Sequence, residues 1–382
     1  MKKQTSFISV VMPCLNEEKT VGICVKKALQ GIKSSGFKGE VVVADNGSID
    51  KSVNIATKAG ARVVREKIKG YGSAYLAGIK AAKGDWIVIG DSDDTYNFRQ
   101  IPKLITPLKN GADLVLGSRL KGQLESGSMP WLNRNLGTPL LNLFIRIFYN
   151  IKISDSQSGM RAFSKKTYCR LNLQTTGMEF ASEMLIRAAQ EGMSIDEVPI
   201  SYSRRIAPTK LSRFKDAWRH IRFMLLFAPT QLFLIPGAVF MGIGLLGLFL
   251  IALAPINIFG RILDIHSLIL ASMLTLLGYQ IIMLGIYAKT FGWTTGFVKG
   301  GLVINTTLKF YNLERGLATG FIISVVGLLI GVVSFIGWAR AGFGQLQAIR
   351  PAVVAMTLFV LGIQIVFSSF FLSVLGIKQK KK

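Results

Sequence analysis

Acidic residues, histidine and cysteine are all scarce in this chain. Its 382 residues include 21 Asp and Glu against 46 Lys and Arg, two histidines and three cysteines. Cys14, Cys24 and Cys169 form no CxxC pair, so the sequence suggests neither a zinc site nor a disulfide framework. Such cysteine usage is typical of a reducing cytosolic environment. The two histidines, His220 and His266, lie near none of the motifs described below.

The shortage of acidic residues is most pronounced in the C-terminal part. Half of all residues are apolar and the formal net charge is +25; residues 231–382 hold 11 basic and 2 acidic side chains. Basic chains bind nucleic acid or anionic membrane surfaces, and the long apolar runs here favour a membrane, with no nucleic-acid partner. At the N-terminus, two lysines precede an apolar run too short, and too soon followed by acids, for a signal peptide. We therefore expect residue 1 to stay in the cytosol.

Four uncharged apolar segments reach the roughly 20 residues that a helix needs to cross a bilayer core. They cover about 233–254, 267–288, 317–338 and 352–376. A buried core helix can be as apolar, but four such runs with charged residues only between them indicate membrane spans. The sequence thus predicts a four-helix transmembrane domain over 231–382 that ends in a basic tail.

Orientation follows from where Lys and Arg gather in the short loops. They concentrate before the first span, between the second and third spans, and in the tail; the other two loops hold only Arg261, Arg340 and Arg350. We expect an integral membrane protein with its N-terminal domain and both termini cytoplasmic, in the cell membrane of a prokaryote or the endoplasmic reticulum of a eukaryote. The segment 212–230 mixes cations with Trp218 and Phe223, which predicts an interfacial amphipathic helix.

Residues 1–211 alternate between two kinds of pattern. Short apolar or β-branched runs at 7–12, 40–44, 61–65, 85–90 and 113–117 are separated by helical patterns such as 19–33, 51–59 and 73–83. This alternation predicts an α/β domain with a mainly parallel sheet covered by helices.

Polar and acidic residues follow three of these predicted strands. Gly90-Asp91-Ser92-Asp93-Asp94 comes after the fourth strand and places three carboxylates where ligands bind in open α/β sheets. Oxygen ligands of this kind suit Mg²⁺ or Mn²⁺ together with a phosphate substrate. Taken alone, the cluster is equally well explained as a turn, because Asp and Ser are common turn formers. Asp45 and Asp50 likewise allow an Asx turn or an N-cap, and for Asp50 the cap is the better interpretation.

Glycines at 70 and 72 open the third helix and could present backbone N–H groups to a phosphate. A turn with a helix cap explains them at least as well. Their spacing is not that of the dinucleotide-binding GxGxxG motif, because the third glycine position is Tyr75.

Taken in order, the motifs resemble glycosyltransferase family 2, and within it the polyprenyl-phosphate hexose synthases, such as dolichol-phosphate mannose synthase. The resemblance covers residues 7 to about 211. It implies a GT-A fold, a nucleotide-sugar donor (UDP- or GDP-hexose) and a divalent metal, Mg²⁺ or Mn²⁺. The motifs are Pro13-x-x-Asn16-Glu17, Asp45-Asn46-Gly47-Ser48-x-Asp50, Gly70-x-Gly72-x-Ala74, Asp91-Ser92-Asp93, Gly117-Ser118-Arg119, Asp155-x-Gln157-Ser158-Gly159-x-Arg161, and Arg204 with Lys210.

The resemblance also implies roles for particular residues. Asp91 and Asp93 would hold the metal, with Thr95 at a place where some relatives carry Gln. The predicted phosphate-binding residues are Arg119, Arg161, Arg204 and Lys210, and the predicted catalytic residues are Asp155, Arg119 and Asp93. The predicted nucleotide-sugar site consists of Pro13, Leu15, Asn16, Glu17, Asp45, Asn46, Gly70, Gly72, Asp91 and Ser92.

The implied reaction transfers a hexose to a polyprenyl or dolichyl phosphate. Because such an acceptor is already an anion near neutral pH, a strong general base is hardly required. Asp155 could therefore be an acceptor-side base or positioning residue, or a cap for the turn at Ser158-Gly159. The apolar residues 131–153 could rest on the membrane interface or pack on the sheet. Glu183 is expected to pair with a neighbouring Arg.

Several alternatives stay open from the sequence. The Asp-Asp-Thr-Tyr continuation at 93–96 favours UDP-glucose, with GDP-mannose and UDP-N-acetylglucosamine as alternative donors. A processive polysaccharide synthase is less favoured, because residues 213–219 lack the QxxRW element. A transporter is disfavoured because no charge lies inside the spans. Small residues within 320–333 permit a homo-oligomer.

Overall fold

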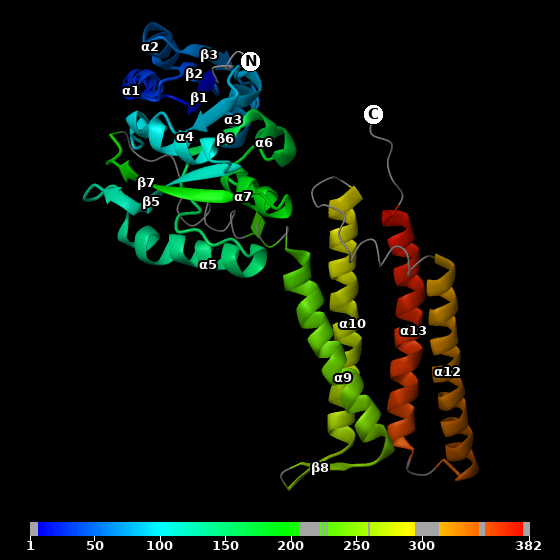
Figure 1. Ribbon diagram of the computed structural model, residues 1–382. Coiled ribbons are helices and arrows are strands. Elements are labelled where there is room, and N and C mark those ends of the chain that lie inside the picture. Colours follow the sequence, from blue (N-terminus) through cyan, green and yellow to red (C-terminus); the bar gives the residue numbers. More distant parts are fainter. Residues whose placement is uncertain are drawn as a thin grey trace. The chain divides into compact units, whose positions relative to one another are not determined.

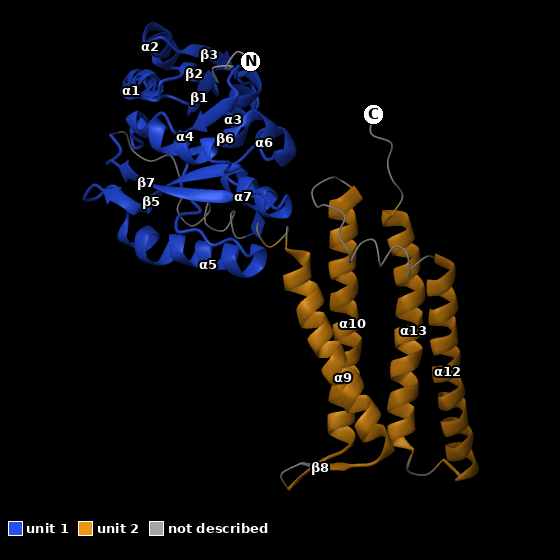
Figure 2. Ribbon diagram, viewed as in Figure 1, with its two compact units in different colours: residues 1–224 blue, residues 225–382 orange. Residues whose placement is uncertain are grey.

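The computed structural model describes residues 7–206, 222–223, 225, 228–258, 260–294, 313–343 and 348–376. Two compact units make up the chain, residues 1–224 and residues 225–382 (Figure 2). The predicted domain limits, 1–211 and 231–382, fall inside these units and stay predictions. Lys210 and most of the predicted interfacial helix at 212–230 lie outside the described residues.

A seven-stranded mixed sheet forms the centre of the first unit (Figure 1), in the order β3-β2-β1-β4-β6-β5-β7. All five predicted strands are present, and β3, β2, β1 and β4 are parallel neighbours, which confirms the α/β prediction. Two strands were not predicted: β6, which runs antiparallel between β4 and β5, and β7, which extends the sheet beyond β5. The bounds are β1 (Phe7–Cys14), β2 (Lys38–Asp45), β3 (Arg62–Arg65), β4 (Trp86–Ile89), β5 (Leu114–Leu124), β6 (Arg161–Ser164) and β7 (Ile195–Tyr202).

Helices cover both faces of the sheet because side chains of a strand alternate between its faces. On one face, Ile8, Val10 and Met12 of β1 share a core with apolar residues of α1, α2 and α4. On the other face, Val11 contacts α3 where Gly78 leaves room for it. The helices of this unit are α1 (Val21–Ser34), α2 (Ser52–Lys58), α3 (Tyr71–Ala81), α4 (Ile101–Lys109), α5 (Thr138–Tyr149), α6 (Lys165–Leu171) and α7 (Phe180–Gln190).

Helix α5 is apolar on more than its packed side. Leu141 and Ile145 are buried against the unit, whereas Leu140, Leu143 and Ile147 are 52%, 49% and 62% exposed. The packing interpretation of residues 131–153 thus holds for the buried face of α5, and membrane contact of the exposed apolar face stays a prediction. Large exposed apolar patches mark contact with a partner or a membrane.

Among its described residues, the second unit contains four helices long and apolar enough to cross a membrane. They are α9 (Ile235–Leu253), which continues a π-helical turn at Thr230–Leu234, α10 (Ile265–Thr294), α12 (Leu313–Arg340) and α13 (Ile349–Leu375). The four predicted spans are therefore present with slightly different limits. A short antiparallel pair that was not predicted, β8 (Ile256–Ile258) and β9 (Arg261–Leu263), connects α9 to α10.

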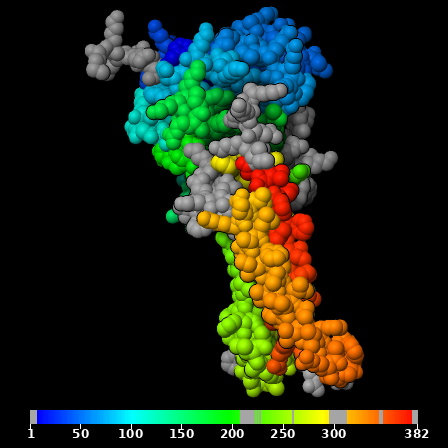
Figure 3. Space-filling model, turned by 90° about the vertical axis from the view of Figure 1, so that its right-hand side faces the viewer, coloured from blue at the N-terminus to red at the C-terminus, as the bar shows by residue number. Residues whose placement is uncertain are grey.

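The four helices form two hairpins, in which α9 packs along α10 and α12 packs along α13. Figure 3 shows α12 in orange beside α13 in red. Glycines permit the close approach: a Cβ on Gly362 would meet the backbone of Gly320 and Ser324, and one on Gly278 would meet the backbone of Met241. Small residues play this part at many helix contacts in membranes.

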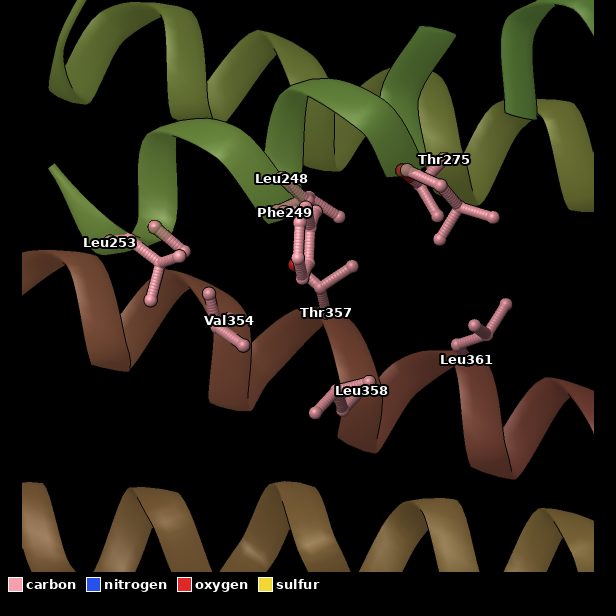
Figure 4. Close-up of a pocket in the computed structure, with 10 residues that line it drawn as sticks. Leu248, Phe249, Leu253, Thr275, Val354, Thr357, Leu358 and Leu361 are labelled. Carbon is pink, nitrogen blue, oxygen red and sulfur yellow. The ribbon is translucent and has the colours of Figure 1, made fainter. Parts of the chain in front are cut away.

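A cavity of about 280 Å³ lies between α9, α10 and α13 (Figure 4). Leucine, valine, phenylalanine and alanine side chains line it together with Thr275 and Thr357. Both hydroxyls are occupied, since Thr275 donates to the Ala271 carbonyl oxygen and Thr357 to that of Val353. No charged group lines this cavity, so it does not suit a nucleotide or a metal ion.

Candidate functional site

The ends of β1, β2 and β4 bring the predicted donor-site segments to one edge of the sheet. Because these three strands are parallel neighbours, the residues after Cys14, Asp45 and Ile89 share that edge. Ser92 Oγ donates to the Pro13 carbonyl oxygen at 2.6 Å and joins two of the ends. Its hydroxyl is used in the fold, and binding of the nucleotide sugar by Ser92 stays a prediction.

Asp91 lies in an aromatic pocket. The hydroxyls of Tyr71 and Tyr75 donate to its Oδ1 at 2.9 and 3.2 Å, and both tyrosines stand one turn apart on α3. Burial of the carboxyl and, after it, the charge of Asp93 raise the pKa of Asp91 to about 6, although the two tyrosine hydrogen bonds lower it. A carboxylate pair of this kind is stabilised by any cation that binds between its members. The tyrosines were not predicted as partners of Asp91.

Asp93 and Asp94 point to different surroundings. Thr95 Oγ1 donates to Asp93 Oδ1 at 2.6 Å, so the threonine orients this carboxylate, and metal binding by Thr95 itself stays a prediction. Asp94 has a positive φ of 63° and pairs with Lys27 of α1 at 2.7 Å. The geometry therefore separates Asp91 and Asp93, which face the site, from Asp94, which stabilises the turn.

The donor set fits a Mg²⁺ or Mn²⁺ ion that a substrate diphosphate would help to hold. Among the described residues, no three His, Cys, Asp or Glu side chains gather as a ready metal cage. Mg²⁺ is usually bound by one or two carboxylates together with waters and phosphate oxygens, which is what Asp91 and Asp93 offer.

Arg205, a residue that the sequence did not single out, reaches the acidic site. Its Nη2 lies 2.7 Å from Glu17 Oε1, and its Nε lies 3.5 Å from Asp93 Oδ2 without a hydrogen bond of its own. The predicted phosphate ligand Arg204 is exposed, and its backbone N–H donates to Glu125. The neighbouring Arg205 faces the acids and Arg204 does not, because successive residues leaving a strand point in opposite directions; phosphate binding by Arg204 stays a prediction.

Arg119 and Asp155 form a buried bidentate ion pair. Arg119 Nε and Nη2 each lie 2.8 Å from a different carboxylate oxygen, and the Arg119 backbone N–H donates to Asp155 as well. The guanidinium also lies over the ring of Tyr202, 5.1 Å from its centre. Asp155 is fully buried and both its oxygens accept from Arg119, so the carboxylate holds the guanidinium in place; its role as an acceptor-side base stays a prediction.

Arg161 holds the backbone of three neighbouring segments, and phosphate binding by this residue stays a prediction. It is 1% exposed, and its three guanidinium nitrogens donate to the carbonyl oxygens of Ser156, Ser158 and Ala181. Burial lowers the pKa of this guanidinium from its ordinary value. With its donors turned to the backbone, Arg161 joins β6, the loop before it and α7.

Several predicted donor-site residues shape the loops at the sheet edge. Asp45 accepts from the backbone N–H groups of Gly47 and Ser48, which is the Asx turn considered above. The Asn46 amide donates to the carbonyls of Glu66 and Ile68, and its oxygen accepts from Gly70. Asn16 has a positive φ of 52° and accepts from the Ile49 backbone N–H. Leu15 is 37% exposed beside them. Nucleotide contacts by these residues stay predictions.

Asp50 is a capping residue, as the sequence indicated. Its carboxylate accepts from the backbone N–H groups of Ser52, at the start of α2, and of Glu18. This contact joins the segment after β1 to the segment after β2.

Gly70 and Gly72 are explained by packing. A Cβ at either position would collide with the carbonyl oxygen of Thr176 or Thr175, and Ser73 N–H donates to the Thr176 oxygen. The Ser73 N–H at this helix start is thus bonded within the chain, and phosphate binding at Gly70 and Gly72 stays a prediction. Glu183 is buried and holds the same loop by accepting from Gln174 and Thr175, with Arg187 at 3.5 Å as its predicted arginine partner.

Comparison with known proteins identifies the family of the chain. Residues 9–170 match glycosyl transferase family 2, and residues 286–376 match the glycosyltransferase family 2 C-terminal transmembrane region. The chain is 40% identical over 97% of its length to the low-salt glycan biosynthesis hexosyltransferase Agl6 of Haloferax volcanii, 89% of which is covered. A dolichyl-phosphate hexose transferase of the same organism is 36% identical over 54% of this chain and 87% of that protein.

Among solved structures, glucosyl-3-phosphoglycerate synthase from Mycobacterium tuberculosis, crystallised with Mn²⁺, UDP and glucosyl-3-phosphoglycerate, is 25% identical with a TM-score of 0.46. The match covers 58% of this chain and 79% of that one. The sequence matches confirm the resemblance that the motifs indicated, and with it the GT-A type of α/β fold. By its identity to a hexosyltransferase over nearly its whole length and by both matched regions, this chain is a membrane glycosyltransferase of glycosyltransferase family 2.

Proposed function

We propose that this glycosyltransferase moves a hexose, with UDP-glucose the favoured donor, to a polyprenyl or dolichyl phosphate in the membrane. The observation that carries the proposal is the pair Asp91 and Asp93 at the sheet edge, in a chain that also has four membrane helices. A relative that is 36% identical is named a dolichyl-phosphate hexose transferase, which supports a lipid phosphate as the acceptor.

On the donor side, Asp91 and Asp93 would hold Mg²⁺ or Mn²⁺, which neutralises charge on the departing diphosphate when bound. Arg205 adds a planar cation beside Asp93 and Glu17, and guanidinium groups suit phosphates because they contact two oxygens at once. Arg205 is thus the described cation best placed to contact the diphosphate, ahead of Arg204.

On the acceptor side, Arg119 is the proposed ligand of the lipid phosphate. Asp155 holds two of its nitrogens, which leaves the outer edge of the guanidinium for an anion. Because the phosphate acceptor is already ionised, the reaction asks for orientation and charge neutralisation more than for a base. This interpretation makes Asp155 a positioning residue.

The apolar outer face of α5 gives the lipid a surface to approach. Leu140, Leu143 and Ile147 are exposed on a unit whose chain continues into four membrane helices. We propose that this face contacts the bilayer on the cytoplasmic side, where the positively charged loops orient the protein.

The decisive experiment incubates membranes carrying the protein with a radiolabelled nucleotide sugar and a polyprenyl phosphate, with and without Mn²⁺. UDP-glucose, GDP-mannose and UDP-N-acetylglucosamine are tested in parallel, and label should enter the lipid fraction from UDP-glucose in a metal-dependent way. Label from another donor would correct the sugar, and no label from any donor would contradict the proposal. Polymeric product would favour the processive synthase.

Asp93→Asn provides the test of the acidic site within the same assay. The substitution keeps the shape of the side chain and removes the negative charge, so transfer should fall by about 100-fold or more. Asp113→Asn, half-buried just before β5 and so at the opposite edge of the sheet, is the matched control and should keep full activity. Full activity of Asp93→Asn would remove this residue from the metal role.

A further inference from the structure

The loop Ser154–Ser156, which carries Asp155, is held by side chains from three other elements. Glu197 of β7 accepts from the backbone N–H groups of Ser154 and Asp155, and Arg161 donates to the Ser156 carbonyl oxygen. The two backbone groups of Ser154 and Ser156 that are left, one C=O and one N–H, bind Asn142 of α5. Asn142 Nδ2 donates to the Ser154 carbonyl oxygen at 2.5 Å, and Asn142 Oδ1 accepts from the Ser156 N–H at 3.0 Å.

Asn142 thus forms hydrogen bonds with the loop on both sides of Asp155. Both contacts come from one planar amide, so a shift or rotation of α5 moves the backbone on either side of this carboxylate together. Asp155 in turn holds Arg119 through two hydrogen bonds of 2.8 Å. Helix α5 is therefore connected to the Arg119 guanidinium in two steps. Two hydrogen bonds join Asn142 to the loop, and two more join Asp155 of that loop to Arg119.

The same helix carries the exposed apolar face on its other side. Leu143 and Ile147 are 49% and 62% exposed, while Leu141 and Ile145 are buried. Asn142 lies between these two faces and is half-buried. Helix α5 therefore connects an exposed apolar surface, suited to contact with lipid, to the Arg119–Asp155 ion pair on the proposed acceptor side.

We propose that Asn142 is a positioning residue that couples the seating of α5 on a lipid surface to the placement of Arg119, by way of the Ser154–Ser156 loop. The inference rests on the proposed transfer to a lipid phosphate and adds a residue to that same site. Displacing a group near the reaction by about 1 Å can cost roughly 100-fold in rate, so a small movement of α5 is enough.

A purely structural role for Asn142 is the alternative, and a double-mutant cycle separates the two. Variants that act through one connected path are not additive, whereas variants that act independently are. Ile147→Ser makes the exposed face of α5 less apolar and so weakens its contact with lipid. Asn142→Ala removes the two hydrogen bonds from α5 to the loop. If Asn142 transmits the seating of α5, Ile147→Ser should have little further effect once Asn142 is gone.

The experiment uses the full chain in lipid nanodiscs, with UDP-glucose, Mn²⁺ and a polyprenyl phosphate. We expect each single variant to lower kcat by about tenfold and the double variant to be within about twofold of Asn142→Ala. The KM for UDP-glucose should stay unchanged in all three, because the hydrogen bonds of Asn142 to described residues are to the Ser154–Ser156 loop and not to the donor edge. Asn135→Ala is the matched control: within the described part of the chain, the Asn135 amide donates to Trp131 in its own turn, and kcat should stay at the wild-type value.

Folding is checked by thermal unfolding and by UDP-glucose binding. If Asn142→Ala is unstable, Asn142→Asp keeps the acceptor for Ser156 and removes only the donor, and it should show the same lack of additivity. A double variant about 100-fold below wild type, or a normal kcat for Asn142→Ala, would overturn the coupling. A wild-type protein that labels no lipid phosphate would overturn the proposed function itself, a different and separately visible result.

Discussion

At the scale of single residues, the type of a side chain was less informative than the direction in which the fold turns it. Arg119, Arg161 and Arg204 were predicted to bind phosphate, and each has a different surrounding. Arg119 is paired with Asp155, Arg161 donates to three carbonyl oxygens, and Arg204 is exposed while its neighbour Arg205 meets the acidic site. An arginine in a motif is therefore able to bind a phosphate, but the groups that its guanidinium contacts in the fold determine whether it is available to do so.

Arg205 and Arg204 give a matched pair of substitutions. Arg205→Gln removes a cation that contacts Glu17 at 2.7 Å and lies 3.5 Å from Asp93, so the KM for the nucleotide sugar should rise about tenfold. Arg204→Gln should leave it within about twofold, because that side chain is exposed. Steady-state kinetics at varied donor concentration measure both. Equal effects, or a larger effect at Arg204, would reverse the assignment.

Arg161→Met tests the structural assignment of the buried arginine. The substitution leaves the carbonyl oxygens of Ser156, Ser158 and Ala181 without their donors, and each buried unsatisfied group costs about 1–3 kcal/mol. The melting temperature of the purified protein should therefore drop sharply in a thermal unfolding scan. An unchanged melting temperature combined with a raised KM would instead restore Arg161 as a phosphate ligand.

At the scale of elements, the apolar pattern of the sequence predicted long segments more accurately than short ones. The membrane helices and the parallel strands have strong apolar signals, because each is buried in core or lipid along most of its length. The strand β6 has four residues, Arg161–Ser164, and opens with an arginine, so no periodicity marks it. Its antiparallel place between β4 and β5 depends on partners far away in the chain.

Gly362 shows how closely two elements can approach. Gly362→Ala would place a Cβ against the backbone of Ser324 and Gly320 on α12, and overpacking of this kind costs about 1–3 kcal/mol. We expect a lower melting temperature in detergent. The control is Gly337→Ala on α12, where a Cβ meets nothing within 4 Å. Identical melting temperatures for the two variants would contradict the close packing of α12 on α13.

At the scale of the whole molecule, the two units differ in their charged residues and in the length of their apolar segments. The chain carries a formal charge of +25, and the membrane unit has two acidic residues, of which Asp264 pairs with Arg350 at 2.7 Å. Cations at the boundaries of the spans favour the cytoplasmic side in loops of this length. The proposed orientation therefore places the nucleotide-sugar site where its charged donor is dissolved.

Cysteine labelling tests this orientation. With Cys169 as the one exposed native cysteine among the described residues, a membrane-impermeant maleimide should not label intact cells until they are permeabilised. In a Cys169→Ser background, Asn257→Cys in β8, an exposed position between α9 and α10, should be labelled in intact cells. Labelling of Cys169 before permeabilisation would invert the proposed topology, as would a reporter fused after Lys382 that reads as extracytoplasmic.

The sequence by itself determined the α/β class, the four spans and the segments that meet at the sheet edge. These follow from apolar periodicity and from the rule that parallel strands end at a common edge, both of which are local or topological. The tertiary structure alone decided which arginine faces the acids, that Thr95 supports Asp93, and that Asn142 holds the loop of Asp155. Such contacts join residues from different elements, and a pattern along the chain carries no information about which side chains meet across space.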